Sequence, residues 1–222
     1  WNQVRFNIAP QIKIGNFSLP FNFNFAAIPT NFAGPSGGLG ALGHQSFAQF
    51  ISNPMNNFSI NPKYKWAELQ LGTQYLNYSN LSTGDIGVFG AGFDLRPKDF
   101  LFKFFTGLSQ QSVNFFTGPP ATTGAYKRKN WMVHIGKAKE GKYEATMNFV
   151  KAKDVLSSLM IPPPSVKPQE GFTYSFVTKV NFYKNWYINV EGARSFYTKN
   201  LLTPLDSANK SFKPFISAHT ST

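Results

Sequence analysis

A histidine and a serine one residue apart are the residues with the clearest potential for covalent chemistry. On a strand, the spacing of His44 and Ser46 would put both side chains on one face, where an imidazole can activate a hydroxyl as a nucleophile. The pair instead follows the glycine-rich stretch 37–43, which predicts a loop, and no third residue that would orient the histidine can be identified. We therefore assign no catalytic residue and expect that the protein is not an enzyme.

Metal and cofactor sites are not predicted either. The three histidines are scattered, the chain has no cysteine, and no spacing of histidine and acidic residues suits a metal ion. Gly87, Gly90 and Gly92 are not followed by a helix whose N-terminus could bind a phosphate. Glycines inside a strand mark a bend or the close approach of another element, and we expect that structural role here. His134 is expected to be a polar lumen-facing residue and not a base.

The chain carries a net charge of +12, from 22 Lys and Arg against 10 Asp and Glu. The basic residues form no stripe and no nucleic-acid-binding motif is present, so we expect no nucleic-acid partner. Four of them fall on the polar faces of expected strands and would make an enclosed lumen attractive to anions: Arg5, Lys13, Lys103 and Lys179. Glu144 and Glu191 are the main acidic residues that oppose them, and an equally weighted alternative is that the basic residues pair with carboxylates from strands outside this chain.

The elements that must position these residues are long amphipathic strands. In residues 3–26, apolar and polar residues alternate on both sides of a two-residue turn, Gly15-Asn16. Strands of about ten residues with one aromatic-rich face and one polar face are typical of a transmembrane β-barrel, because lipid lies outside it and water inside. The composition agrees, since only 14% of residues are charged whereas soluble domains carry about 25%. No apolar run is long enough for a transmembrane helix.

Short and long connections alternate between the predicted strands. Eleven strands are expected, at 3–14, 17–26, 45–60, 64–77, 85–95, 100–113, 126–137, 142–153, 171–182, 186–199 and 211–220. The short connections are expected at 15–16, 61–63, 96–99, 138–141 and 183–185. An up-and-down meander through one membrane predicts this rhythm, with short periplasmic turns and longer extracellular loops. Because bacterial barrels have even strand numbers, eleven strands indicate part of a larger barrel, and the start at Trp1 favours an internal piece of a longer protein.

Two long loops and several aromatic residues complete the prediction. The loop at 27–44 lies within residues 14–62, which contain no charged residue, so it is expected either to be a surface loop or to fold into the lumen or onto a partner. The loop at 154–170 contains four prolines and is expected to be stiff. Aromatic residues near strand ends are expected in interfacial girdles: Tyr64, Trp66, Tyr75, Tyr78, Trp186 and Tyr187.

Three motifs follow one another in the central part of the chain. Asn61-Pro-Lys-Tyr-Lys-Trp66 leads into a strand, and Gly90-Ala-Gly-Phe-Asp-Leu-Arg-Pro-Lys98 with Phe100-Leu-Phe-Lys-Phe-Phe-Thr-Gly107 would form the next hairpin. Over about residues 17–195, the chain resembles a group of large, poorly characterised outer-membrane β-barrel proteins of Bacteroidota. The resemblance implies an outer-membrane barrel that continues past this chain, and it implies no reaction.

The expected fold is therefore an all-β, antiparallel up-and-down transmembrane β-barrel, with residues 1–222 forming one domain or part of one. We expect a protein of the bacterial outer membrane, without a cofactor, whose partners are outer-membrane lipid, lipopolysaccharide and other outer-membrane proteins. Its expected function is transport or secretion across that membrane, as a separate protein or within a larger complex. The alternatives are a non-conducting scaffold barrel that binds partner proteins through its loops, a barrel-embedded lipid hydrolase using His44 and Ser46, and a soluble β-sandwich or fatty-acid-binding barrel.

Overall fold

The computed structural model describes residues 4–27, 57–83, 86–115, 117, 123–139, 141–159, 163–183, 186–202 and 210–221. Apart from one turn of 3-10 helix at Leu156–Ser158, the regular structure of these residues is β-strand. Beyond Ala27, the predicted loop at 27–44 lies outside the described residues, as do His44, Ser46 and most of the predicted strand 45–60. The described residues include no helix that is long and apolar enough to cross a membrane.

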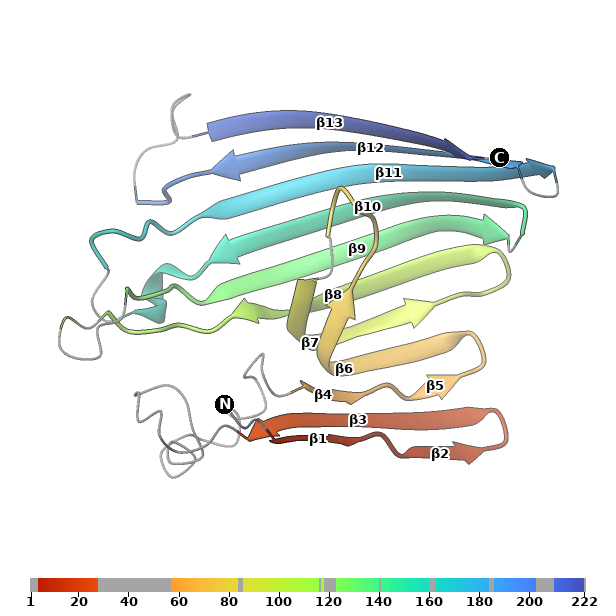
Figure 1. Cartoon of the computed structure of the whole chain (residues 1–222), viewed down its shortest axis with the longest axis horizontal. Helices are drawn as coiled ribbons and strands as arrows, with labels where there is room; N and C mark the ends of the chain where they lie inside the picture. Colours follow the sequence, from red (N-terminus) through yellow and green to blue (C-terminus); the bar gives the residue numbers. More distant parts are fainter. Residues whose placement is uncertain are drawn as a thin grey trace.

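The described residues contain thirteen strands, which form one sheet (Figure 1). They are β1 (Val4–Ile8), β2 (Gln11–Ile14), β3 (Phe17–Ala27), β4 (Asn57–Ile60), β5 (Lys63–Tyr64), β6 (Ala67–Leu76), β7 (Ile86–Leu95), β8 (Phe100–Gln110), β9 (Arg128–Lys139), β10 (Tyr143–Asp154), β11 (Glu170–Tyr183), β12 (Trp186–Thr198) and β13 (Lys210–Ser221). Eight of them are ten to thirteen residues long and β11 has fourteen, which is about twice the common strand length of soluble proteins.

The predicted antiparallel meander is confirmed. The strand order is β1-β3-β4-β6-β7-β8-β9-β10-β11-β12-β13, so strands that follow one another in the chain are neighbours in the sheet. The short strand β2 continues β1 in the same register along β3, and β5 likewise continues β4, because a proline interrupts each pair at Pro10 and Pro62. The order ends at β1 and β13, which are not paired with each other among the described residues.

Short turns join the strands at one end of the sheet (Figure 1). Gly15 has the positive φ expected of its two-residue turn. One predicted turn is misplaced, however: residues 61–63 lie within the incoming strand, and the chain reverses at Lys65 and Trp66 instead. Lys65 adopts a φ of 51° in this turn. Glycine or asparagine usually marks such a position in a sequence, and neither occurs here.

The sheet has two chemically different faces. On β9, alternate residues are buried and exposed, with Asn130, Met132 and His134 on one side and Trp131 on the other. We name the first side the covered face, because the tip of the β6–β7 hairpin packs against it (Figure 1). The second side is the open face. The strand registers continue the two faces from β6 to β12, as the alternation of the sequence predicts.

Candidate functional site

The tip of the β6–β7 hairpin leaves the plane of the sheet. Among the described residues, β4 pairs with β6 only as far as Gly72, and β8 pairs with β7 only from Phe89 onwards. Residues 73–76 and 86–88 therefore pair only with each other in this part of the chain. Gly72, Gly90 and Gly107 are in register across three strands at this bend. A Cβ atom at any of the three would overlap a backbone carbonyl of the neighbouring strand, at Phe58, Thr106 or Phe89, respectively. Glycine is therefore required for this close approach, as predicted for Gly90.

An apolar cluster holds the hairpin tip against the covered face. Leu76 and Val88 come from the tip, and they pack on Phe105 of β8, Met132 of β9 and Val150 of β10. All five side chains are at least 93% buried, which fixes the tip over the middle of the sheet.

Residues 77–83, which we name the inserted segment, continue from this tip across the covered face. The hydroxyl oxygen of Ser79 lies 3.0 Å from that of Ser175 on β11. The backbone N–H of Leu81 donates a hydrogen bond of 2.9 Å to Oε1 of Glu191 on β12. Within the segment, the N–H of Tyr78 donates to Oγ1 of Thr83 at 2.8 Å. The segment is thus tied to strands that are about one hundred residues away in the sequence.

A polar network runs beneath the inserted segment. The ring of Tyr78 stacks on that of His134, with centroids 5.1 Å apart, and the imidazole Nδ1 of His134 is hydrogen-bonded to the amide oxygen of Asn148. The amide Nδ2 of Asn148 in turn donates to Ser175 Oγ at 3.0 Å. Burial, with a smaller effect of Asp94, raises the pKa of the Tyr78 phenol, so the hydroxyl stays protonated. His134 is thus linked to Ser175 through Asn148, and among the described residues no direct hydrogen bond joins the imidazole to the Ser175 hydroxyl.

Ion pairs flank this network towards both ends of the strands. Asp94 on β7 accepts Arg96 Nη2 at 2.9 Å and Lys103 Nζ at 3.1 Å. At the other end, Arg128 Nε donates to Asp154 Oδ1 at 2.7 Å. Each of these carboxylates is almost fully buried and has a guanidinium partner, the arrangement that a buried charge needs to be stable.

Several polar atoms of the covered face have no hydrogen-bond partner among the described residues. They are buried side-chain atoms of Gln70, Asn130, Thr146, Asn189 and Tyr78. Buried polar atoms of folded proteins are almost always bonded to protein or water. Water is the partner that such atoms take when no protein atom is within reach.

Two hollows lie beside the bent hairpin and the short turns. One, of about 180 Å³, is lined by Tyr75, Gly87, Phe89 and Leu108 with neighbouring residues, where the hairpin tip separates from β8. The other, of about 310 Å³, lies between Lys63, Lys65, Glu68, Asp94 and Arg96 at the short-turn end. No cluster of three or more histidine, cysteine or acidic side chains suited to a metal ion occurs in the part of the chain that is described.

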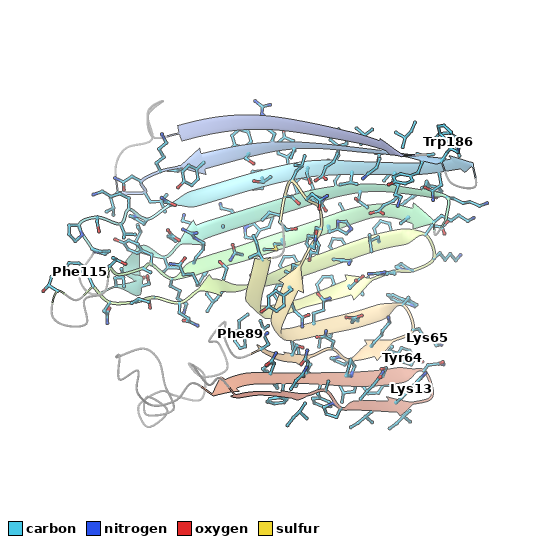
Figure 2. The ribbon with its side chains drawn as sticks, in the orientation of Figure 1. Lys13, Tyr64, Lys65, Phe89, Phe115 and Trp186 are labelled. Carbon is cyan, nitrogen blue, oxygen red and sulfur yellow. The ribbon has the colours of Figure 1, made fainter. Side chains whose placement is uncertain are left out.

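The four basic residues predicted to line the lumen, three lysines and one arginine, have different environments. Lys103 lies on the covered face and is paired with Asp94 of the neighbouring strand β7, a carboxylate that was not predicted from the sequence to be its partner. Lys179 is also on that face, opposite Glu144 and 4.9 Å above the ring of Tyr187. Lys13 is exposed at the short-turn end, and the side chain of Arg5 lies outside the described residues (Figure 2). The covered face therefore carries balanced charges, not a purely basic surface.

The predicted girdle residues fall into two groups. Tyr64, Trp66, Tyr75 and Trp186 have exposed side chains, and Figure 2 shows Tyr64 and Trp186 at the short-turn end of the sheet. Tyr78 and Tyr187 differ from the expectation, because both belong to the covered face: Tyr78 stacks on His134, and Tyr187 lies under Lys179. For Tyr187, the neighbouring Trp186 takes the opposite face, since successive strand residues alternate.

The sequence did not reveal the inserted segment. The residues between the predicted strands 64–77 and 85–95 were expected to be one of the longer connections, yet the hydroxyl group of Ser79 contacts the covered face at Ser175. The signal that was available is the pair of strand glycines, Gly72 and Gly90, whose alignment becomes visible only once the register is known.

No protein-family model, curated protein or solved structure matches this chain. The class that the fold and site define is thus an all-β chain with a large antiparallel meander sheet and a hairpin folded onto one face.

Proposed function

We propose that this sheet is part of the wall of an outer-membrane β-barrel that serves transport or secretion across the membrane, with the inserted segment narrowing its lumen. The main observation behind this proposal is that the two faces of the sheet are buried and exposed in the opposite way to those of a soluble protein. A soluble sheet buries its apolar face and exposes its polar one. Here most buried polar side chains lie on the covered face, beside the one apolar cluster that holds the hairpin tip, and the large exposed apolar side chains lie on the open face. This is the distribution of a barrel with lipid outside and water inside.

The open face supports the membrane part of this proposal. Met147 and Phe176 lie in the middle of long strands and Val180 lies nearer the short turns, and these residues are 43–48% exposed. On β9, the apolar run Trp131, Val133 and Ile135 is bounded by Lys129 at one end and Lys137 at the other. Eight residues at about 3.4 Å each separate these lysines by about 27 Å along the strand, or about 21 Å in height at a tilt of about 40°. An outer-membrane barrel has an apolar band of about 25 Å.

The covered face supports the water-filled side. Asn148 and Ser175 are 0% and 1% exposed, respectively, and they form a continuous polar network with His134. The unpaired polar atoms on the same face would be hydrated in a lumen. The inserted segment crosses this face and would reduce the free cross-section.

Adjacent residues on opposite faces allow a matched test. Phe176 belongs to the open face and Val177, opposite Glu191, to the covered face. We expect Phe176→Arg to reduce insertion of the full-length protein into phospholipid vesicles strongly, because an arginine at the lipid-facing midplane costs about 2–4 kcal/mol. Val177→Arg should insert nearly as well as the unchanged protein, since the guanidinium faces water and Glu191. The measurement is the membrane-inserted, protease-protected fraction, and the reverse order of the two variants would contradict the proposal.

The alternative function is a non-conducting scaffold, and the inserted segment favours it because the segment covers the polar face. Measuring ion conductance distinguishes this alternative from transport. The transport proposal predicts discrete channels when the full-length protein is incorporated in a planar bilayer. A protein that inserts but stays silent, also in a variant whose residues 77–83 are replaced by a short glycine-serine linker, would instead support a non-conducting scaffold.

A further inference from the structure

Three lysines gather at one end of the apolar open face. Lys129 on β9 and Lys153 on β10 are directly opposite each other in the register, and Lys151 is two residues before Lys153 on β10, on the same face. All three share the open face with Trp131, which is the direct partner of Lys151. They lie at the end of the strands where the long connections are, away from the short turns (Figure 1). We name them the lysine cluster.

One carboxylate is shared between two members of this cluster. Glu170 is opposite Lys153 in the register, and its oxygens lie 2.7 Å from Lys151 Nζ and 3.4 Å from Lys153 Nζ. The three ammonium groups and the single carboxylate leave a local charge of about +2. The side chains of Lys151 and Lys153 remain 34% and 54% exposed, so an external anion can reach them.

Aromatic rings adjoin the lysine cluster on its apolar side. Phe172 packs with Trp131, Tyr174 and Phe196, at centroid distances of 6.1, 6.4 and 6.4 Å. These four residues come from β9, β11 and β12 and form an aromatic patch on the open face, where the guanidinium of Arg194 on β12 lies 5.4 Å from the ring centroid of Phe196. The combination of an aromatic patch with cations beside it complements an amphiphile that has acyl chains and an anionic head group.

We propose that the lysine cluster binds the phosphate groups of a lipid A-type glycolipid, whose acyl chains lie along the aromatic patch. This assignment rests on the proposed function, because it requires the open face to contact lipid and the long connections to face the outer leaflet. The lysines are spread over two strands and can meet more than one phosphate, which favours a multiply phosphorylated glycolipid over a phospholipid with a single phosphodiester. Glu170 competes with the lipid for Lys151 and Lys153.

The test is a titration of the purified full-length protein, in a non-ionic detergent, with diphosphoryl lipid A, with the bound fraction read by native mass spectrometry. We expect the triple variant K129Q/K151Q/K153Q to weaken binding about tenfold or more, since each basic side chain near an anionic surface contributes several-fold. The matched control K137Q/K139Q/K142Q removes as many charges at the short-turn end and should stay within about twofold of the unchanged protein. Dephosphorylated lipid A should not bind to the cluster.

A variant that binds more tightly shows that the changes in binding do not come from misfolding. Glu170→Gln removes the competing carboxylate and should tighten lipid A binding several-fold. Equal losses in the two triple variants, no loss in the first, or equally tight binding of phosphatidylglycerol would overturn the proposal. If the protein inserts into vesicles as proposed but its cluster variants bind lipid A unchanged, the lipid site fails alone. If Phe176→Arg inserts into vesicles better than Val177→Arg, both the membrane proposal and the lipid site fail.

Discussion

At the scale of single residues, crowding and backbone conformation together explain why Gly72 is required. Its φ of 91° is unfavourable for other residues, and a Cβ atom would also overlap the carbonyl oxygen of Phe58. Gly15 provides a matched control, because its φ of 58° is also positive but its Cβ position has no neighbour within 4 Å. The two positions therefore separate the cost of conformation from the cost of crowding.

We expect Gly72→Ala to lower the free energy of unfolding of the full-length protein by about 3 kcal/mol or more, since β4 must move away from β6 as well. Gly15→Ala should cost about 1 kcal/mol, from backbone strain alone. Urea unfolding in detergent micelles, followed by tryptophan fluorescence, measures both values. Equal losses for the two variants would show that the close approach at Phe58 does not constrain the bend.

Individual residues were less predictable than the strands that carry them. The polar assignment of His134 followed from alternation and is matched by its buried place on the covered face. Its stacking on Tyr78 could not be predicted, because the two residues are 56 positions apart and meet only when the hairpin bends. Proximity to a strand end was thus a poor guide for Tyr78, whose environment is set by a tertiary contact.

At the scale of elements, alternation predicted most strands but not their exceptional geometry. The segments from β6 to β12 agree with the predicted ones to within a few residues, because each keeps period-two alternation over ten residues or more. Prolines and a turn without glycine caused the errors around residues 61–66. The inward bend of β6 and β7 depends on three glycines being in register, which is a property of pairing and not of one strand's sequence.

The contact between the inserted segment and β11 can be tested by cross-linking, since the chain contains no cysteine. Ser79 and Ser175 have hydroxyl oxygens 3.0 Å apart, so Ser79→Cys with Ser175→Cys should form a disulfide in most molecules under mild oxidation. The control pairs Ser79→Cys with Ser195→Cys, because Ser195 is opposite Thr173, one strand and two residues away from Ser175. A shift of gel mobility that is reversed by reductant reports the bond. Equal cross-linking of both pairs would contradict the described seating of the segment.

At the scale of the whole molecule, the meander requires all short turns to share one side. Asn16, Lys65, Lys98 and Lys142 lie in four such turns, and the picture places these turns at one end of the sheet (Figure 1). The exposed Ser157 belongs to the connection at the opposite end. If the sheet spans the outer membrane with its long connections outside, these two ends meet different compartments.

Labelling of single cysteines in the full-length protein, in cells, measures which side of the membrane each end of the sheet faces. We expect Ser157→Cys to react with a membrane-impermeant maleimide on intact cells, whereas Asn16→Cys, Lys98→Cys and Lys142→Cys should react only after the outer membrane is permeabilised. Met147→Cys, in the middle of the open face, should remain largely unlabelled in both states, because lipid shields it and a thiolate does not form in an apolar medium. Labelling of Met147→Cys at the rate of Ser157→Cys would show that water contacts the open face. In an antiparallel meander that pairs each strand with the next, all the short turns lie at the same end of the sheet. If some turn variants reacted on intact cells and others only after permeabilisation, the sheet could not span one membrane in a single orientation.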